Sequence, residues 1–485
     1  MEVKSSDSSD EIAKDSVEGV ENNGSFVEET VNVKSNETVN EKREIRKKII
    51  TLALPSVGEN LLQTIFSLVD MMFIGRLGTA ALAGAGLANQ VNFIIVSLIA
   101  ALSIGTAVVI AQNIGASNEK AAKDAAFQSI YLSLILSSIL FVLAIFFSRR
   151  LFYLFDAEPD VIRYAGDYLY WITVPSFFFV PTFIFGSIFR GSGDTKTPFY
   201  VMMVTNSLNI FLDYALIFGR FGFPRLEVAG AAIATSASRA VAVVIYSYII
   251  FSGKREFSLP FKFPKFKLDV VRKIIDVGFP TSLERLSHSV GNLFFATVVL
   301  SLGTAALAAH RITINIDSIS MNIGLGFMTA TTTLVGINVG NSDIEGAKKT
   351  TYEAVKIAVI IMGLVGVVMI CFPDIFIRLF TDDVDVVMRA RSAVRIIGCI
   401  QPLLATSNIF QGALRGGGNV KTPLISTTIG MWLFRVPLSY IFVNFIDLGL
   451  GSVWIAMAID IGFRAIFLFF NFRNRTDFKK YIIQE

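Results

Sequence analysis

The chain has 485 residues, of which 53% are hydrophobic and only 17% are charged, and its formal net charge is +4. A soluble domain usually carries about 25% charged residues, so this composition indicates that much of the surface faces lipid, and the small net charge gives nucleic-acid binding no support. The two cysteines and two histidines show no metal-ligand or disulfide spacing, and no nucleophile that would indicate an enzyme stands out.

The first segment of the chain, residues 1–44, is polar and rich in Glu, Asp, Ser and Asn. A segment of this kind buries too little apolar surface to offset the entropy of the free chain. It also lacks the apolar stretch of a signal peptide. We therefore predict a disordered acidic tail.

Long apolar runs recur from Ile49 onward, each near the length of about 20 residues that crosses a bilayer. We predict twelve spans, at 49–72, 88–112, 125–147, 165–188, 197–218, 228–252, 272–298, 311–336, 350–373, 391–413, 422–445 and 450–472. Lipid offers no hydrogen-bond partner to an open backbone, so each span is expected to be a helix. The predicted fold class is an all-α polytopic membrane protein.

Lysine and arginine divide the connections between spans into two sets. Lysine-rich segments precede the first span, link the sixth to the seventh and follow the twelfth. The opposite connections are poorer and hold arginines only, among them Arg76, Arg220, Arg311 and Arg391. By the positive-inside rule, both termini are expected in the cytoplasm of a multi-pass protein of the cell membrane.

An internal repeat gives the strongest sign of organisation. The heptapeptide LGTAALA at 77–83 recurs at 302–308, and the RGxGxxKTP segment at 190–198 recurs at 415–423. Pro55 likewise recurs as Pro280, and the offset is 225 throughout (280 − 55 = 225; 423 − 198 = 225). Two halves of six spans each enter the membrane in the same direction, so we expect a pseudo-twofold axis along the membrane normal.

The repeat predicts five parts of the chain. These are the 1–44 tail, an N-terminal six-helix lobe at 45–252, a basic cytoplasmic linker at 253–271, a C-terminal six-helix lobe at 272–472 and a basic cytoplasmic tail at 473–485. The RGxGxxKTP segments lack the glycine spacing of a phosphate-binding loop. We interpret them as cytoplasmic turns between helices.

Polar residues inside the spans of the first half form a candidate site. Asp70 lies late in span 1, and Asn209 and Asp213 share one face of span 5 because they are four residues apart. Tyr164 and Tyr168 lie early in span 4, which runs the other way, so all five are expected at similar depth in the outer half of the membrane. Ionisable groups at such positions are functional candidates.

Two neighbouring carboxylates in a low-dielectric environment take up a proton more readily than two carboxylates in water. Amide and phenol oxygens beside them could instead coordinate Na⁺. A plainer alternative is that Asp70 and Asp213 lie at the aqueous interface, paired or hydrated. At the 225-residue offset Asp70 becomes Phe295 and Asp213 becomes Leu438, so the acid cluster belongs to one half alone.

Unlike Asp70 and Asp213, Glu59 has an acidic counterpart in the other half, because Glu284 occupies the equivalent position. The two glutamates are interpreted either as structural hydrogen-bonding groups within each lobe or as further carboxylates that contact the coupling ion or the substrate. In the second half Asp317, Arg435 and Asp460 are additional candidates, and any of them could be part of a buried pair.

These features together resemble the multidrug and toxic compound extrusion (MATE) family, in its DinF-like branch. The resemblance covers about 46–470 and is carried by LVD at 68–70, RGSGDTKTP from Arg190 and NIFLDY at 209–214. It implies an efflux pump that exports cationic or amphipathic small molecules in exchange for H⁺ or Na⁺ while two lobes rock between inward-open and outward-open states.

The resemblance also implies a coupling site in the N-terminal lobe. The residues of that coupling site match Asp70, Asp213 and Asn209 of this sequence. The tyrosine of span 4 matches Tyr168, with Tyr164 as the alternative. Any Na⁺ would bind at the two aspartates and the asparagine. The sequence departs from some members, because Phe66 stands where a tyrosine can occur and Glu284 comes earlier in span 7 than the glutamate of another branch.

The resulting hypothesis is a monomeric H⁺- or Na⁺-coupled exporter that needs no cofactor beyond its coupling ion. The alternative is a flippase for a lipid-linked precursor, which a cavity lined by several cations would favour; Arg435 is one such cation. A channel is expected to have matching pore-lining residues in both halves, and the one-sided acid cluster opposes that interpretation.

Overall fold

The computed structural model describes residues 10–154, 157–262, 264–445, 449–474, 478 and 480–481, with side chains from Asn40 onward. Most of the predicted acidic tail, residues 1–44, lies outside the described side chains and stays a prediction. The chain divides into two compact units, Met1–Lys48 and Ile49–Glu485.

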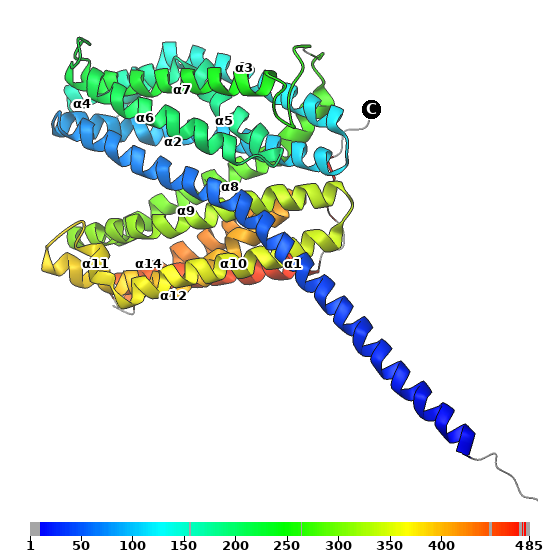
Figure 1. Ribbon diagram of the computed structural model, residues 1–485. Coiled ribbons are helices and arrows are strands. Elements are labelled where there is room, and N and C mark those ends of the chain that lie inside the picture. Colours follow the sequence, from blue (N-terminus) through cyan, green and yellow to red (C-terminus); the bar gives the residue numbers. More distant parts are fainter. Residues whose placement is uncertain are drawn as a thin grey trace, which may run out of the picture. The chain divides into compact units, whose positions relative to one another are not determined.

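Helices make up the regular structure of the described residues (Figure 1). The first half holds α1 (Asp10–Gly75), α2 (Thr79–Gly115), α3 (Glu119–Phe147), the short 3₁₀ helix η1 (Leu151–Leu154), α4 (Pro159–Thr173), α5 (Ser176–Gly191), α6 (Lys196–Phe218) and α7 (Glu227–Phe251). The second half holds α8 (Leu268–Leu300), α9 (Thr304–Gly340), α10 (Ile344–Cys371), α11 (Pro373–Ile377), α12 (Val384–Gly416), α13 (Lys421–Ile429), the π-helix η2 (Gly430–Arg435), α14 (Val436–Phe445) and α15 (Leu450–Arg473).

The 225-residue repeat seen in the sequence is present in the helix bounds. Shifting α2 by 225 reproduces α9 at both ends (79 + 225 = 304; 115 + 225 = 340). The first residues of α3 and α6 likewise fall on the first residues of α10 and α13. The predicted all-α fold with two equivalent halves is therefore confirmed.

Twelve spans follow from these helices. Ten are long and apolar enough to cross a membrane by themselves, and α4 with α5 forms a further span bent by 58°. The twelfth is α8, which has 33 residues and matches the span of α1 at the 225-residue offset, although charged residues crowd its first turns.

The break between α4 and α5 was not predicted. Pro175 lies at the break, where it can neither donate a backbone hydrogen bond nor continue the helix without a clash. The equivalent position of the second half is Ile400, and there α12 runs on without interruption. The local sequence, and not the shared fold, therefore bends this span.

Several helices begin earlier than predicted. The helices α2 and α9 begin at Thr79 and Thr304, nine and seven residues earlier than predicted (88 − 79 = 9; 311 − 304 = 7). Their first turns are rich in alanine and were not counted as part of the predicted apolar spans. The helix α12 likewise begins at Val384, seven residues before its predicted start (391 − 384 = 7). Arg311 therefore lies within α9 and Arg391 within α12, and the prediction that both lie in connections was wrong.

The RGxGxxKTP segments form the predicted turns. Each turn places a glycine, Gly193 or Gly418, in the left-handed region at φ +87° or +77°, which a side chain would strain. Asp194 then accepts hydrogen bonds from the backbone N–H groups of Lys196 and Thr197 at the start of α6. The turn thus reverses the chain and satisfies donors that the first turn of a helix leaves free.

Within Ile49–Glu485, α2 to α7 lie together on one side and α9 to α15 on the other (Figure 1). The two groups touch where α2 and α9 end. A Cβ atom on Gly115 would overlap the carbonyl oxygen of Ile337, and a Cβ atom on Gly340 would overlap that of Gln112. Since Gln112 and Ile337 are themselves 225 residues apart, this is one contact made twice across a pseudo-twofold axis.

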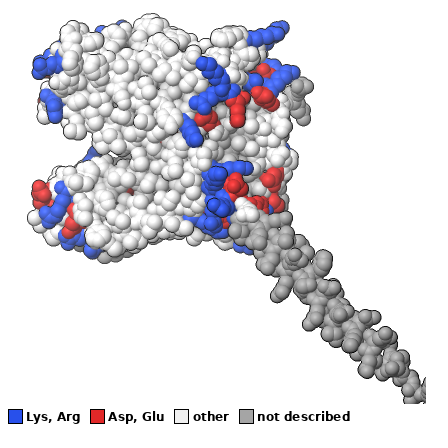
Figure 2. All heavy atoms as spheres, viewed as in Figure 1, with Lys and Arg blue, Asp and Glu red and all other residues white. Residues whose placement is uncertain are grey.

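The surface of this unit has the pattern of a membrane protein. On the face drawn in Figure 2, charged side chains gather toward the two ends of the helices, and a broad uncharged band separates them. The same view shows a hollow between the two groups of helices, at the end where α4 and α11 lie and opposite to the ends of α2 and α9.

Candidate functional site

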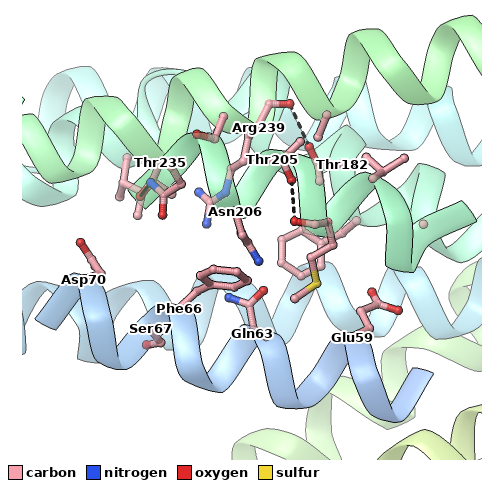
Figure 3. A pocket seen from close by; sticks show the side chains of 18 of the residues that line it. Glu59, Gln63, Phe66, Ser67, Asp70, Thr182, Thr205, Asn206, Thr235 and Arg239 are labelled. Atoms are coloured by element: carbon pink, nitrogen blue, oxygen red, sulfur yellow. Dashed lines mark hydrogen bonds between the residues drawn. The ribbon is translucent and has the colours of Figure 1, made fainter. Parts of the chain in front are cut away.

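One face of α1 lines a cavity of about 240 Å³ in the first lobe. The side chains that face it are Glu59, Gln63, Phe66, Ser67 and Asp70 (Figure 3). Glu59, Gln63, the adjacent Phe66 and Ser67, and Asp70 follow one another at about one helical turn and so lie on a single side of the helix, with Glu59 at one end of the cavity and Asp70 at the other (Figure 3).

The opposite wall comes from α4 to α7. Tyr168, Asn209 and Arg239 line it together with the hydroxyl groups of Thr182, Thr205 and Thr235. Figure 3 shows Thr235, Asn206 and Arg239 facing α1 across the cavity. Asn209 donates a hydrogen bond from Nδ2 to Thr235 Oγ1 at 3.4 Å, and its carbonyl oxygen accepts none from the described residues.

Asp213 lies one turn beyond Asn209 on α6 and only 1% of its surface is exposed. Neither of its carboxylate oxygens accepts a hydrogen bond from the described part of the chain. It lies close enough to Asp70 for the two carboxylates to interact electrostatically, and both also interact with Tyr168. The structure thus brings together Asp70, Asn209, Asp213 and Tyr168, as the sequence predicted.

Arg239 is the member of this group that the sequence analysis missed. Its side chain reaches the cavity from α7 and interacts electrostatically with Asp70 and Tyr168. The guanidinium carbon lies 3.9 Å from the centroid of the Phe179 ring, and NH1 has no hydrogen-bond partner among the described residues. An arginine within a span that recurs at the equivalent position, Arg464, was the signal that could have identified it.

The two lobes give this arginine different acidic neighbours. In the second lobe Arg464 bonds to Asp460, four residues before it on the same helix. The position equivalent to Asp460 is Thr235, so in the first lobe the acids come from α1 and α6 instead. The first-lobe cluster therefore combines two carboxyl groups, those of Asp70 and Asp213, with the guanidinium group of Arg239.

Tyr164 does not belong to this cluster. Its hydroxyl group donates a hydrogen bond to Glu227 Oε2 at 2.9 Å, and it is not among the residues that line the cavity. Of the two tyrosines that the sequence left open, Tyr168 is the one that faces Asp70 and Asp213.

Glu59 and Glu284 form the same ion pair in the two lobes. Glu59 bonds to Arg190 at 2.9 Å and Glu284 bonds to Arg415 at 2.8 Å, each partner being the arginine of an RGxGxxKTP turn. Glu284 also accepts a hydrogen bond from Thr427 at 3.0 Å. The geometry supports the structural interpretation of these glutamates, because each carboxylate ties the first span of its half to the turn after the fourth.

The second-lobe candidates lie around a separate cavity of about 640 Å³. Asp317 lines it and accepts a hydrogen bond from Gln401 at 3.0 Å. Arg435 also lines it and bonds to Asp460, whose carboxylate is fully buried and is shared with Arg464. The candidates of this lobe are therefore in buried polar contacts, and none of them joins the Asp70 cluster.

The chemistry of the first-lobe site suits a proton or a small hard cation. Oδ1 of Asp70 and both oxygens of Asp213 are buried without hydrogen bonds from the described residues. Oxygen donors of this kind are those preferred by hard cations. No group of three or more His, Cys, Asp or Glu side chains is arranged to hold a metal ion in the part of the chain that the structure describes.

Comparison with known proteins identifies the family. A profile described as MatE matches residues 55–215 and again 280–441, once in each half. The probable multidrug resistance protein NorM of Thermotoga maritima is 39% identical over 422 residues, which cover 87% of this chain and 91% of the relative. The uncharacterized transporter YisQ of Bacillus subtilis is 27% identical and covers 89% and 95% of the two chains.

Solved structures agree with these sequence matches. A structure described as the outward-facing conformation of a multidrug resistance MATE family transporter of the MOP superfamily superimposes with a TM-score of 0.83 at 28% identity, covering 88% of this chain and 95% of that one. The DinF-like branch stays a prediction. The repeated fold, the matching profile in each half and the 39% identity show that the chain belongs to the MATE family of membrane transporters.

Proposed function

We propose that the protein is a secondary antiporter that exports cationic or amphipathic small molecules in exchange for H⁺ or Na⁺. The names of its relatives, which refer to multidrug resistance, support export of several compounds. The proposal includes a location in the cell membrane with both termini in the cytoplasm, and a single chain as the working unit, because one chain supplies both lobes.

The paired carboxyl groups of the first-lobe site support ion coupling. Asp70 and Asp213 interact with each other, and Asp70 also interacts with the guanidinium group of Arg239, so with both carboxyl groups ionised the uptake of one monovalent cation would make this group of three neutral. A neutral site can be desolvated at much lower cost than a charged one. Ion binding would therefore favour a different lobe arrangement from the ion-free site, which is the differential binding that coupled transport requires.

Two features support alternating access. The lobes are in contact where α2 and α9 end, and the hollow in Figure 2 lies at the opposite end of the helices. With both termini in the cytoplasm, the ends of α2 and α9 would be cytoplasmic and the hollow would open outward. This agrees with the likeness to an outward-facing structure. Rocking about the α2–α9 contact would open the other side.

The test is efflux of a fluorescent organic cation, ethidium, from proteoliposomes under an imposed pH or Na⁺ gradient. Asp213→Asn keeps the side-chain shape but removes the charge, so we expect gradient-driven efflux to be lost. The control is Asp160→Asn, which removes the same charge from a residue whose side chain is 72% exposed at the start of α4, and it should transport like the wild type.

Size-exclusion profiles of the variants establish that each is folded. The gradient that drives wild-type efflux names the coupling ion. If Asp213→Asn exports ethidium as fast as the wild type under both gradients, the first-lobe site is not the coupling site. If the wild type exports nothing under either gradient, antiport of organic cations is itself wrong.

The flippase alternative gains one observation, the arginine-lined cavity of the second lobe. Besides Arg435, the sequence-predicted cation, the wall includes Arg285, Arg311, Arg415 and Arg464. A flippase for a lipid-linked precursor should move a labelled polyprenyl phosphate between leaflets without an ion gradient. Ethidium efflux that depends on Asp213 would instead favour the antiporter.

A further inference from the structure

The cavity of the second lobe is lined by an excess of positive charge that the MATE resemblance does not explain. Five arginines reach it, from α8, α9, α12, η2 and α15: Arg285, Arg311, Arg415, Arg435 and Arg464. These residues are far apart in the sequence, and folding brings their guanidinium groups around one space of about 640 Å³.

The acids nearby account for only part of this charge. Glu284 bonds to Arg415, and the carboxylate of Asp460 is divided between Arg435 and Arg464. Asp317 is bonded to the neutral side chain of Gln401. Arg285 and Arg311 form no ion pair within 4 Å with any described residue, although Arg285 interacts electrostatically with both Arg415 and Glu284. Three carboxylates thus face five guanidinium groups.

The shared fold does not require these charges. At the 225-residue offset the first lobe has Asn60 in place of Arg285, Gly86 in place of Arg311 and Ile210 in place of Arg435. Arg435 in addition ends a π-helix, η2, which interrupts the regular helix seen at the matching positions of α6. Such wide turns occur often at functional sites, because they change the direction in which the following side chains point.

Most of the remaining accessible wall of the cavity is apolar, although neutral polar side chains such as Asn292 and Asn408 also line it. Phe295, Ile314, Met321 and Met328 line it alongside the arginines, and Phe295 stands at the position where the first lobe has Asp70. The ring of Phe295 lies 5.7 Å from the guanidinium carbon of Arg435. The cavity therefore offers cationic groups next to an apolar surface, which is the reverse of the acid-containing cavity of the first lobe.

We propose that this cavity binds an amphipathic organic anion. Arg285 and Arg311 would hold its carboxylate, sulfonate or phosphate, because a guanidinium group forms strong charge-assisted hydrogen bonds to such oxyanions. The apolar wall would hold an aromatic or alkyl body. That the anion is transported cargo rests on the proposed function, whereas its binding can be measured without transport.

The experiment measures binding of 1-pyrenebutyrate to the full-length protein in a neutral detergent. Of the three tryptophans, Trp454 is buried behind the cavity wall, with its ring centroid 5.3 Å from that of His310, which lines the cavity. With Trp171 and Trp432 replaced by Phe, energy transfer from Trp454 to pyrene reports occupancy of this cavity. The matched probe is 1-pyrenebutanol, which has the same body and no charge.

We expect the anion to bind at least about tenfold more tightly than the alcohol, since one charge-assisted hydrogen bond accounts for a difference of that size. Arg285→Gln and, separately, Arg311→Gln should each remove most of this preference and leave binding of the alcohol unchanged. The matched control is Arg389→Gln, which removes an arginine that pairs with exposed Asp385 outside the cavity.

Competition distinguishes the two sources of such an anion. Displacement of pyrenebutyrate by phosphatidylglycerol, but not by phosphatidylcholine, assigns the site to a lipid headgroup. Displacement by soluble 1-naphthalenesulfonate alone assigns it to a free amphipathic anion. The inference is overturned if the protein does not prefer the anion over the alcohol, or if neither arginine variant weakens that preference.

The two proposals fail independently in these assays. A wild type that exports ethidium under a gradient but binds both pyrene probes equally leaves the antiport proposal standing without an anion site. Binding that depends on Arg285 and Arg311 in a protein that exports no ethidium would leave the anion site standing and remove organic cations as the cargo.

Discussion

Two ion pairs at matching positions of the lobes differ in how far water reaches them. The side chains of Glu284 and Arg415 are 6% and 7% exposed, whereas those of Glu59 and Arg190 are 21% and 18% exposed. Removal of one partner from a buried pair leaves the other charge desolvated and costs about 3 kcal/mol or more, while a pair open to water contributes about 1 kcal/mol or less.

This difference in burial predicts which of the two glutamate variants is less stable. Glu284→Gln should lower the melting temperature of the detergent-solubilised protein clearly more than Glu59→Gln. The reason is that Arg415 is more deeply buried than Arg190, so its unpaired charge would be less well hydrated. Tryptophan fluorescence during heating measures both. Glu256→Gln, in the exposed connection before α8, serves as the control and should melt like the wild type. Equal shifts for the two glutamate variants would contradict the structural interpretation of these pairs.

The residues of the first-lobe site could be predicted in part. Asp70, Asn209 and Asp213 stood out because carboxyl and amide groups are rare within apolar spans, and helix direction placed them at one depth. Arg239 was missed because only the acids, amides and tyrosines of the first half were considered as site residues, although an arginine within a span that recurs as Arg464 was a usable signal. The difference between them is in their neighbours, Thr235 against Asp460, and those neighbours become visible only when the helices are packed.

At the scale of helices, the contact between α2 and α9 depends on two glycines. Gly115 and Gly340 let the backbone of one helix reach the carbonyl oxygens of the other, Gln112 and Ile337. A methyl group at either position has no space unless the helices separate. Small residues at helix interfaces in membranes commonly serve such close approaches.

Gly340→Ala is therefore expected to loosen the contact between the two lobes at the ends of α2 and α9. Spin labels at Lys123 and Lys348, which are 225 residues apart at the starts of α3 and α10, should report a longer or broader distance distribution in the variant. Cys371 and Cys399 are first replaced by serine. The control is Gly86→Ala in α2, where a Cβ atom meets nothing within 4 Å. Identical distributions for the two alanine variants would show that the close contact does not hold the lobes together.

Helix bounds could be predicted wherever apolar runs or the repeat marked them. The 225-residue repeat alone relates α2 to α9 and α6 to α13, and the first residues of these helices agree at the same offset. The prediction was weaker where a helix starts in small residues, as at Thr79, and where proline acts inside a span, as at Pro175. Hydropathy measures affinity for lipid and not helix length, so it misses both effects.

For the molecule as a whole, two copies of one helical scaffold carry different charged groups. In the first lobe the carboxyl groups of Asp70 and Asp213 lie near Arg239, whereas five arginines line the second-lobe cavity near Asp460. Composition could not predict this division, because the formal charge of +4 is a sum over both lobes. The scaffold fixes where the cavities lie, while substitutions at equivalent positions, such as Asp70 for Phe295, decide what each cavity can bind.

The alternating-access proposal requires that the lobes separate at the end where α2 meets α9, and this can be blocked by a covalent link. A Cβ atom at Gly336 would lie 2.9 Å from the Cβ atom of Ala111, so a shift of less than about 1 Å reaches the 3.5–4.5 Å of a disulfide. In a background without Cys371 and Cys399, Ala111→Cys with Gly336→Cys should lose gradient-driven ethidium efflux on oxidation and regain it with dithiothreitol. Each single cysteine variant should be insensitive to oxidant. Efflux that continues at the wild-type rate in fully cross-linked protein would mean that this contact stays closed during transport, and the rocking motion would have to be replaced by movement within one lobe.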